Sequence, residues 1–341
     1  MRSALVFALS FLFYSGFGQS PQKISIQTGE NKTFNLSEIA EQIHSIMLKM
    51  DQTEPFDVIT DVLWTKEYLF VSVSSIEFQQ QLPARILQYD HKGNFIRRIG
   101  EQGERVGKLL CDTLTNRLFI SKNKSVYCYD FGGKQIDTYL LSDSPDLYDN
   151  GYFWIKTSKP QKEGKGVGYI LSNYSIQTAK ENILFNLTDH NVDSNGAFVA
   201  RPASFSLRNN TPVVSFGIDN TLYQIHEKSV SPVIKFTIDK PTSVMVDTYG
   251  YQFQGFIGNY LCIHYLRNMQ RYLYLKNMNT GKIFQTKQTE SEGIKDDMLN
   301  TGFCKIIPLN RSQYFYFVKK DSKPNLPDVI EHTIYFVKLK P

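Results

Sequence analysis

Apolar and polar residues alternate in short runs along most of the chain, and turn residues separate these runs. A period of two places successive side chains on opposite faces of a strand, so each run predicts a β-strand. One stretch predicts four consecutive strands over Leu109–Leu114, Leu118–Ser121, Val126–Asp130 and Lys134–Leu140. The same pattern continues from Asp57 to the end of the sequence, which favours an all-β fold.

A hairpin pattern occurs twice at a fixed offset. Tyr89, Asp90 and Gly93 of the first copy correspond to Tyr129, Asp130 and Gly133 of the second. The aspartate suits the first position of a type I turn, and the glycine supplies the positive φ that ends the turn. We therefore interpret Asp90, Gly93, Asp130 and Gly133 as structural turn residues of a repeating β unit.

Counting the strands gives six units of roughly 45 residues, without helices between them. Four-stranded antiparallel sheets repeated radially predict a six-bladed β-propeller. In this assignment the fifth unit begins with Ser243–Asp247, and the last unit begins with Gly302–Pro308 and lacks its outermost strand. We expect an N-terminal strand, either Lys23–Gln27 or Ser45–Lys49, to close the ring. A short helix from Ser37 to Ile43 is predicted between them.

The N-terminus has the features of an export signal. Arg2 is followed by the apolar run Ala4–Phe13 and by Gly16-Phe17-Gly18, which predicts a signal peptide over residues 1–18. We expect residues 19–56 to form the N-terminal strand and helix, and residues 57–341 to form the propeller, in one domain. No cysteine follows the apolar run closely and no transmembrane stretch is found, so a periplasmic, cell-surface or secreted protein is predicted.

Composition narrows the function classes. The 20 Tyr and 24 Phe provide a large core, and aromatic residues favour strands. The net charge of +5 is spread along the chain, which argues against nucleic acid as a partner. Cys111 and Cys128 fall on the first and third strands of one unit, too far apart for a disulfide, and Cys262 and Cys304 fall in different units. We expect four free thiols.

The segment Ile86–Leu110, with its Y-D-x-x-G-x-F-I-R-R-I-G pattern, resembles the exported six-bladed propellers related to NHL repeats. The second hairpin, VYCYDFGGKQI, fits the same family. The crossing Gly103–Gly107 lacks the Gly-Pro pair usual in that family, and the lipoprotein cysteine of many members is missing. The resemblance implies the fold and an exported protein, but no settled biochemical role.

Two functional hypotheses follow. Asp61, Asp112 and Asp247 fall on predicted innermost strands, where carboxylates could line a channel and hold calcium for a hydrolase. No nucleophile-elbow motif and no zinc spacing accompanies them. No cofactor is expected under the preferred hypothesis, and calcium is possible under the alternative.

The preferred hypothesis is a monomeric, non-enzymatic binding propeller for a glycan, a peptide or an envelope protein. Its candidate binding residues are aromatic side chains at strand ends and in loops, where a flat ring can stack on a ligand: Trp64, Trp154, Tyr152, Tyr249 and Tyr251. The competing interpretation of these rings is packing between blades. Residues 145–240 repeat least and are the first place to search for a site.

Overall fold

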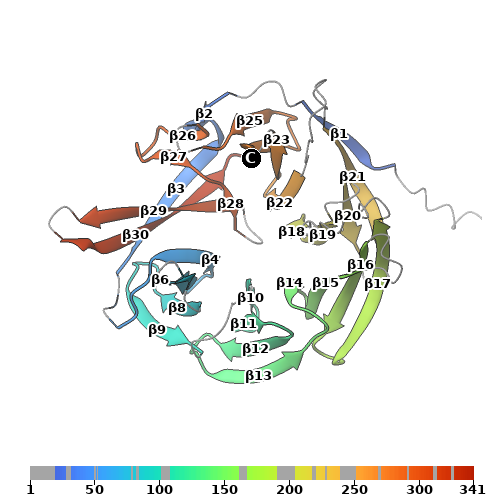
Figure 1. Ribbon diagram of the computed structural model, residues 1–341, viewed down its shortest axis with the longest axis horizontal. Coiled ribbons are helices and arrows are strands. Elements are labelled where there is room, and N and C mark those ends of the chain that lie inside the picture. The colour runs from blue at the N-terminus through green and yellow to red at the C-terminus, as the bar shows by residue number, and fades with distance from the viewer. Residues whose placement is uncertain are drawn as a thin grey trace, which may run out of the picture.

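The computed structural model shows a β-propeller whose sheets surround a central axis (Figure 1). It describes residues 20–27, 32–49, 51, 53–77, 80–81, 84–100, 108–160, 167–189, 204–216, 220–226, 229–238, 251–267, 270–289, 292–309, 313–323 and 326–341. The predicted signal peptide and the crossing Gly103–Gly107 lie outside these residues. The all-β propeller with four-stranded antiparallel blades is confirmed.

The first three sheets along the ring are each built from consecutive antiparallel strands. They are β4 (Val58–Trp64), β5 (Leu69–Ser74), β8 (Arg85–Tyr89) and β9 (Phe95–Ile99); β10 (Leu109–Asp112), β11 (Arg117–Lys122), β12 (Ser125–Asp130) and β13 (Gln135–Leu140); and β14 (Pro145–Asp149), β15 (Tyr152–Pro160), β16 (Val167–Ser175) and β17 (Lys180–Asp189). A two-stranded sheet of β6 (Ile76–Glu77) and β7 (Gln80–Gln81) extends the connection from β5 to β8. The alternation in the sequence locates these units correctly.

Each of the other three large sheets also contains four antiparallel strands. They are β18 (Ser204–Arg208), β19 (Thr211–Ser215), β20 (Thr221–Ile225) and β21 (Val230–Ile238); β22 (Tyr251–Ile257), β23 (Tyr260–Arg267), β24 (Gln270–Asn277) and β25 (Ile283–Lys287); and β28 (Ile307–Pro308), β29 (Tyr314–Lys323), β30 (Leu326–Leu339) and β3 (Ala40–Leu48). The innermost strand of the fifth sheet is β22. The predicted strand Ser243–Asp247 lies outside the described residues.

The described residues form seven sheets of three or more strands, so the prediction of six blades is wrong. The seventh contains β2 (Phe34–Asn35), β26 (Ile294–Asp296) and β27 (Gly302–Cys304). The predicted strand Gly302–Pro308 is divided between this sheet and β28. Because β2 pairs with β26 in parallel from far away in the sequence, local alternation could not reveal this sheet.

Two N-terminal strands join sheets that are formed much later in the chain. Strand β3 pairs antiparallel with β30, with Ile46 opposite Ile334. Strand β1 (Gln22–Ile26) adds in parallel to β21 as a fifth strand. The two alternatives for the closing strand thus have different roles, and the segment containing Ser45 completes the sheet of β28 to β30.

The predicted helix is much shorter than expected. Helix α1 (Leu36–Ile39) is a single turn with Asn35 as its N-cap, and the Glu38 Oε1 accepts the Asn35 N–H at 2.9 Å. From Ala40 onward the chain is already strand β3. The ladder with β30 satisfies the backbone groups that a longer helix would have bonded internally.

Apolar side chains fill the spaces between neighbouring sheets. Between the second and third sheets, the rings of Phe119 and Tyr148 lie 4.6 Å apart and those of Phe119 and Phe153 5.0 Å apart. All four cysteines are free, three of them buried and Cys111 half-buried. Aromatic side chains in the described part of the chain therefore serve packing between blades.

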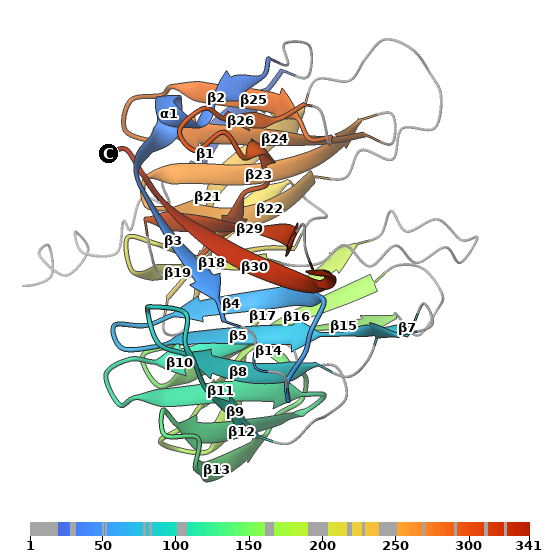
Figure 2. The ribbon, with the colours of Figure 1, turned by 90° about the vertical axis from the view of Figure 1, so that its left-hand side faces the viewer.

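The tight turns between strands define one face of the ring. The turns joining the first strand to the second and the third to the fourth in a sheet, such as β14 to β15 and β18 to β19, lie on the same face, which we call the turn face. These short turns lie toward the left edge of Figure 2. Ligand-binding side chains on this face would be held by rigid strand ends.

Candidate functional site

The turn face carries a cleft between the sheet of β14 to β17 and the sheet of β18 to β21. It encloses about 620 Å³, a volume typical of small-ligand sites. We call it the turn-face cleft. Its lining residues come from the β14–β15 turn, the end of β16, the β18–β19 turn and the end of β20: Asp149, Asn150, Tyr152, Trp154, Asn173, Asn210, Thr211, Pro212, Ile225 and His226.

Two candidate aromatic residues meet in this cleft. Tyr152 and Trp154 lie two positions apart on β15, so their side chains share one face of the strand. Their ring centroids are 6.1 Å apart at an interplanar angle of 38°. Tyr152 is half-buried, whereas Trp154 is only 5% exposed and packs in the core with Leu171 and Phe205.

The indole N–H of Trp154 is buried and has no hydrogen-bond partner among the described residues. An unsatisfied buried donor costs about 1 to 3 kcal/mol, so native proteins rarely retain one without a reason. Its position at a cleft lined by polar groups suggests that a ligand supplies the acceptor. This is the strongest single indication of a binding site on the turn face.

Side-chain amides form the polar walls of the cleft. Asn150 Nδ2 donates to Asp149 Oδ2 at 3.0 Å, and Asn173 Oδ1 accepts from Asn182 Nδ2 at 3.3 Å. Asn150 and Asn210 are exposed and both adopt a positive φ in their turns. Fixed amides beside an aromatic floor can bind a ligand that carries several hydroxyl or carbonyl groups.

Trp64 lies in a different cavity. It lines a mainly apolar space of about 360 Å³ at the axis, together with Leu63, Leu109, Leu147 and Tyr314. Its Nε1 donates to His91 Nε2 at 3.2 Å, and its ring stacks on His44 at 5.9 Å. Trp64 is thus held by packing and hydrogen bonding within the protein and is not brought together with Trp154.

Three other predicted residues cannot be placed beside these aromatics. Tyr249 and Asp247 lie outside the described residues. Tyr251 is the first residue of β22 and pairs with Tyr265 in the ladder. These positions remain sequence-based candidates.

The predicted channel carboxylates connect neighbouring sheets. Asp61 Oδ2 accepts the Leu109 N–H at 2.8 Å and Oδ1 accepts the Val62 N–H at 2.9 Å, while burial raises the pKa of this carboxyl group. Asp112 Oδ2 accepts from the Tyr148 hydroxyl at 2.9 Å. Burial opposes ionisation of Asp112, but hydrogen bonds from Thr115 and Tyr148 outweigh it and lower the pKa.

In the described structure, neither Asp61 nor Asp112 belongs to a cluster of three side chains that could bind a metal ion. No group of three or more His, Cys, Asp or Glu residues suited to a metal ion occurs in the described part of the chain.

Within the described residues, no helix has the length and apolar character needed to cross a membrane.

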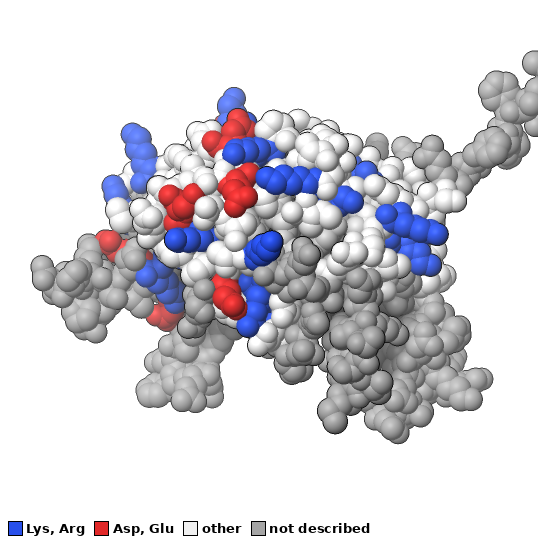
Figure 3. Space-filling view, turned by 90° about the horizontal axis from the view of Figure 1, so that it is seen from above, with Lys and Arg blue, Asp and Glu red and all other residues white. Residues whose placement is uncertain are grey.

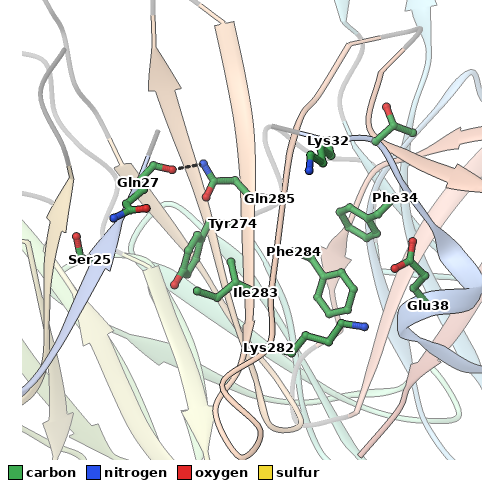
Figure 4. A pocket seen from close by; sticks show the side chains of 11 residues that line it. Ser25, Gln27, Lys32, Phe34, Glu38, Tyr274, Lys282, Ile283, Phe284 and Gln285 are labelled. Carbon is green, nitrogen blue, oxygen red and sulfur yellow. Dashed lines mark hydrogen bonds between the residues drawn. The ribbon is translucent and has the colours of Figure 1, made fainter. Parts of the chain in front are cut away.

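A third cavity lies at the rim of the ring, beside the N-terminal segment (Figure 4). It encloses about 680 Å³ between β1, the residues leading into β2, and the strands β24 and β25. We call it the N-terminal groove. None of its lining residues was a candidate from the sequence, because the segments that form it are far apart along the chain.

The polar residues of the turn-face cleft were also missed, although the sequence carries a signal for them. Asn150-Gly151 and Asn209-Asn210 are turn signals between the first and second strands of consecutive units. Turns at equivalent positions of neighbouring blades lie on the same face. This equivalence would have placed Asn150 and Asn210 near Tyr152.

Comparisons with solved structures show the propeller fold. A protein from Bacteroides fragilis described as a "Putative exported protein" is similar with a TM-score of 0.60 and 12% identity, over 94% of this chain and 100% of that one. The β-propeller domain of Myceliophteria thermophila Cps50 (Swd1) has a TM-score of 0.44 and 9% identity, over 85% of this chain and 99% of that one.

The β-propeller domain of the Trilobed protease from Pyrococcus furiosus has a TM-score of 0.40 and 11% identity, over 84% of this chain and 83% of that one. No protein-family model matches the chain, and no curated protein matches it. The similarity to the Bacteroides protein extends over nearly the whole chain and shows a shared fold, and no comparison shows membership of the NHL-related family.

Proposed function

We propose that the protein is an exported, non-enzymatic binding propeller that recognises a glycan in the turn-face cleft. The observation that carries the proposal is the buried Trp154 N–H, which has no partner among the described residues and lies in a cleft of ligand size. The half-buried Tyr152 ring offers a stacking surface, and the amides of Asn150 and Asn210 offer further hydrogen bonds. A sugar uses all three kinds of contact.

The metal-dependent hydrolase is the weaker alternative. It would need channel carboxylates with free oxygens that converge on one ion. Both oxygens of Asp61 accept backbone N–H groups, and Asp112 is bonded to Tyr148. These bonds favour a role in joining blades, and no observation favours hydrolysis.

The test measures binding after removal of the indole N–H. A glycan and peptide array on the purified protein provides the ligand, and titration calorimetry then compares the wild type with Trp154→Phe. Losing one hydrogen bond while keeping an aromatic ring should weaken binding by roughly tenfold, because such a bond contributes about 1 to 1.5 kcal/mol. Tyr152→Ala should weaken it further by removing the stacking surface.

Trp64→Phe is the matched control, because it makes the same change in the axial cavity. It should leave the affinity unchanged, and the thermal melts of all variants should show that they remain folded. Loss of binding in Trp64→Phe but not in Trp154→Phe would move the site to the axis and contradict the proposal. Binding of peptides alone would contradict the ligand class.

A further inference from the structure

The N-terminal groove is a second concave site, separate from the turn-face cleft. Its walls come from β1 and the segment leading into α1 on one side and from β24 and β25 on the other (Figure 4). The residues that line it are mostly exposed and polar: Ser25, Gln27, Lys32, Thr33, Phe34, Glu38, Tyr274, Lys282, Ile283, Phe284 and Gln285. Any ligand there would be recognised mainly through side-chain hydrogen bonds and charge.

Two lysines give the groove a positive character. Lys32 and Lys282 are exposed, and neither forms an ion pair in the described part of the chain. The Lys282 Nζ lies 4.5 Å from the centre of the Phe284 ring, which holds the ammonium group against the wall. The one carboxylate of the lining, Glu38, already accepts the Asn35 N–H.

The surrounding surface carries both signs of charge, and Lys and Arg side chains are the more widespread on it (Figure 3). Figure 3 shows Lys and Arg side chains distributed along this side of the molecule, with Asp and Glu between some of them. An anionic ligand would be attracted here and would find two ammonium groups without a carboxylate partner in the described structure.

Tyr274 contributes a polar group that is hidden from solvent. Its side chain is 1% exposed, and its hydroxyl has no hydrogen-bond partner among the described residues. Burial raises the pKa of Tyr274 to about 12, so the hydroxyl stays protonated and can donate. Figure 4 shows Tyr274 at the groove between Gln285 and Ile283.

Two backbone carbonyls that face the groove are already bonded across it. The carbonyl of Gln285 accepts the Lys32 N–H at 3.2 Å, and the carbonyl of Gln27 accepts Gln285 Nε2 at 2.6 Å. An extended peptide binds an open sheet edge through such backbone groups. With both positions bonded across the groove, a ligand recognised by side chains fits better than an added strand.

We propose that the N-terminal groove binds an acidic saccharide, with its carboxylate held by Lys32 and Lys282 and its hydroxyls by Ser25, Gln27 and Tyr274. This ligand satisfies the two ammonium groups, the exposed hydroxyl and amide groups, and the buried phenol. It does not need the backbone edges. The site is independent of the glycan site proposed on the turn face.

The experiment is a calorimetric titration of the full protein with trigalacturonate and with neutral galactotriose. The wild type should bind only the acidic trimer, and added salt should weaken that binding. The double variant Lys32→Gln/Lys282→Gln should lose about tenfold or more in affinity, because charge-assisted hydrogen bonds are the strong ones. The matched control Lys124→Gln/Lys134→Gln removes two exposed lysines from the sheet of β10 to β13 and should bind normally.

Three results would overturn the proposal: equal affinity in the lysine variant and the wild type, equal binding of the neutral trimer, or tighter binding of a glutamate-rich peptide than of trigalacturonate. The Trp154→Phe variant tests whether the N-terminal groove and the turn-face cleft are independent sites. It should leave the affinity for trigalacturonate unchanged even if it abolishes binding of the array-derived glycan. A parallel loss of both would show one site where two are proposed.

Discussion

Two glycines at equivalent hairpin positions have different surroundings. Gly93 and Gly133 both have a positive φ, of 78° and 86°. A Cβ on Gly93 would lie 1.9 Å from the carbonyl oxygen of Met47 in β3, whereas a Cβ on Gly133 would lie 3.0 Å from the end of the Ile99 side chain. Backbone cannot move aside as a side-chain methyl can, so the first hairpin tolerates no side chain there.

The different surroundings of Gly93 and Gly133 predict unequal losses of stability when each glycine is replaced by alanine. Gly133→Ala should cost about 1 kcal/mol, mainly from the strained backbone conformation. Gly93→Ala should cost at least roughly 2 kcal/mol more, because it also pushes the hairpin away from β3. Urea unfolding of both variants measures the difference. Equal losses would show that the contact between the Gly93 turn and β3 contributes little.

Two histidines make stability depend on pH: His332 is buried, and His264 is half-buried with its Nε2 buried. Burial, with Arg271 nearby, lowers the pKa of His264 to about 4, and its Nε2 has no partner among the described residues. Burial and Lys320 also lower the pKa of His332, which stacks on Phe56 at 4.7 Å. Each ring is neutral in the folded protein at neutral pH.

A lowered pKa means that the unfolded chain binds the proton first as the pH falls. The stability contributed by neutral His264 is complete above about pH 6.5 and declines as the pH falls from there toward about 4, by up to roughly 3 kcal/mol. His264→Leu should flatten this decline in urea unfolding measured between these values. Unfolding of the wild type above about pH 6.5 gives the baseline from which the decline is measured.

Residue-level prediction from the sequence was good where chemistry is local. In the observed turns, the Asp90 carboxylate accepts the N–H groups of Lys92 and Asn94, and Asp130 accepts that of Lys134. Tyr152 and Trp154 could be proposed as a pair because neighbours on one strand share a face. The repeat could also have placed Asn210 near them, but not Ile225 and His226 at the end of β20, because their approach depends on how two sheets pack.

At the scale of elements, tertiary pairing overrode local preference. Asn35 and Glu38 start a helix, but the ladder with β30 takes over at Ala40, after a single turn. Likewise, residues 302–308 have the alternation of one strand but are divided between two sheets. Alternation located the strands of regular units and failed where a distant segment supplied the partner.

The two N-terminal strands can be separated by deletion. Removing residues 20–31 takes away β1, whose Ile24 and Ile26 are almost fully buried, and should cost about 3 to 5 kcal/mol while unfolding remains cooperative. Removing residues 19–50 also removes β3 and should abolish cooperative unfolding. Circular dichroism melts make the comparison. A sharp melt in the longer deletion would contradict the role of β3 in closing the ring.

At the scale of the whole molecule, the ring places its two proposed sites in different settings. The turn-face cleft lies between consecutive sheets and is formed by tight turns at strand ends. The N-terminal groove lies at the rim and depends on segments from opposite ends of the sequence. The turn-face cleft is lined by residues from 145–240, the least repetitive part of the sequence and the part where the repeat pattern predicts that a site should be sought first. The repeat pattern could not indicate the N-terminal groove.

The pairing of β3 with β30 also sets an order of events during synthesis. The ribosome makes Ala40–Leu48 long before its ladder partner Leu326–Leu339. Until then the sheet containing β29 lacks its outer strand, and the early strand has an open edge. Contacts between such distant segments slow folding. The completed ring can therefore form only after Leu326–Leu339 has been made, and until then the chain depends on whatever shields that edge.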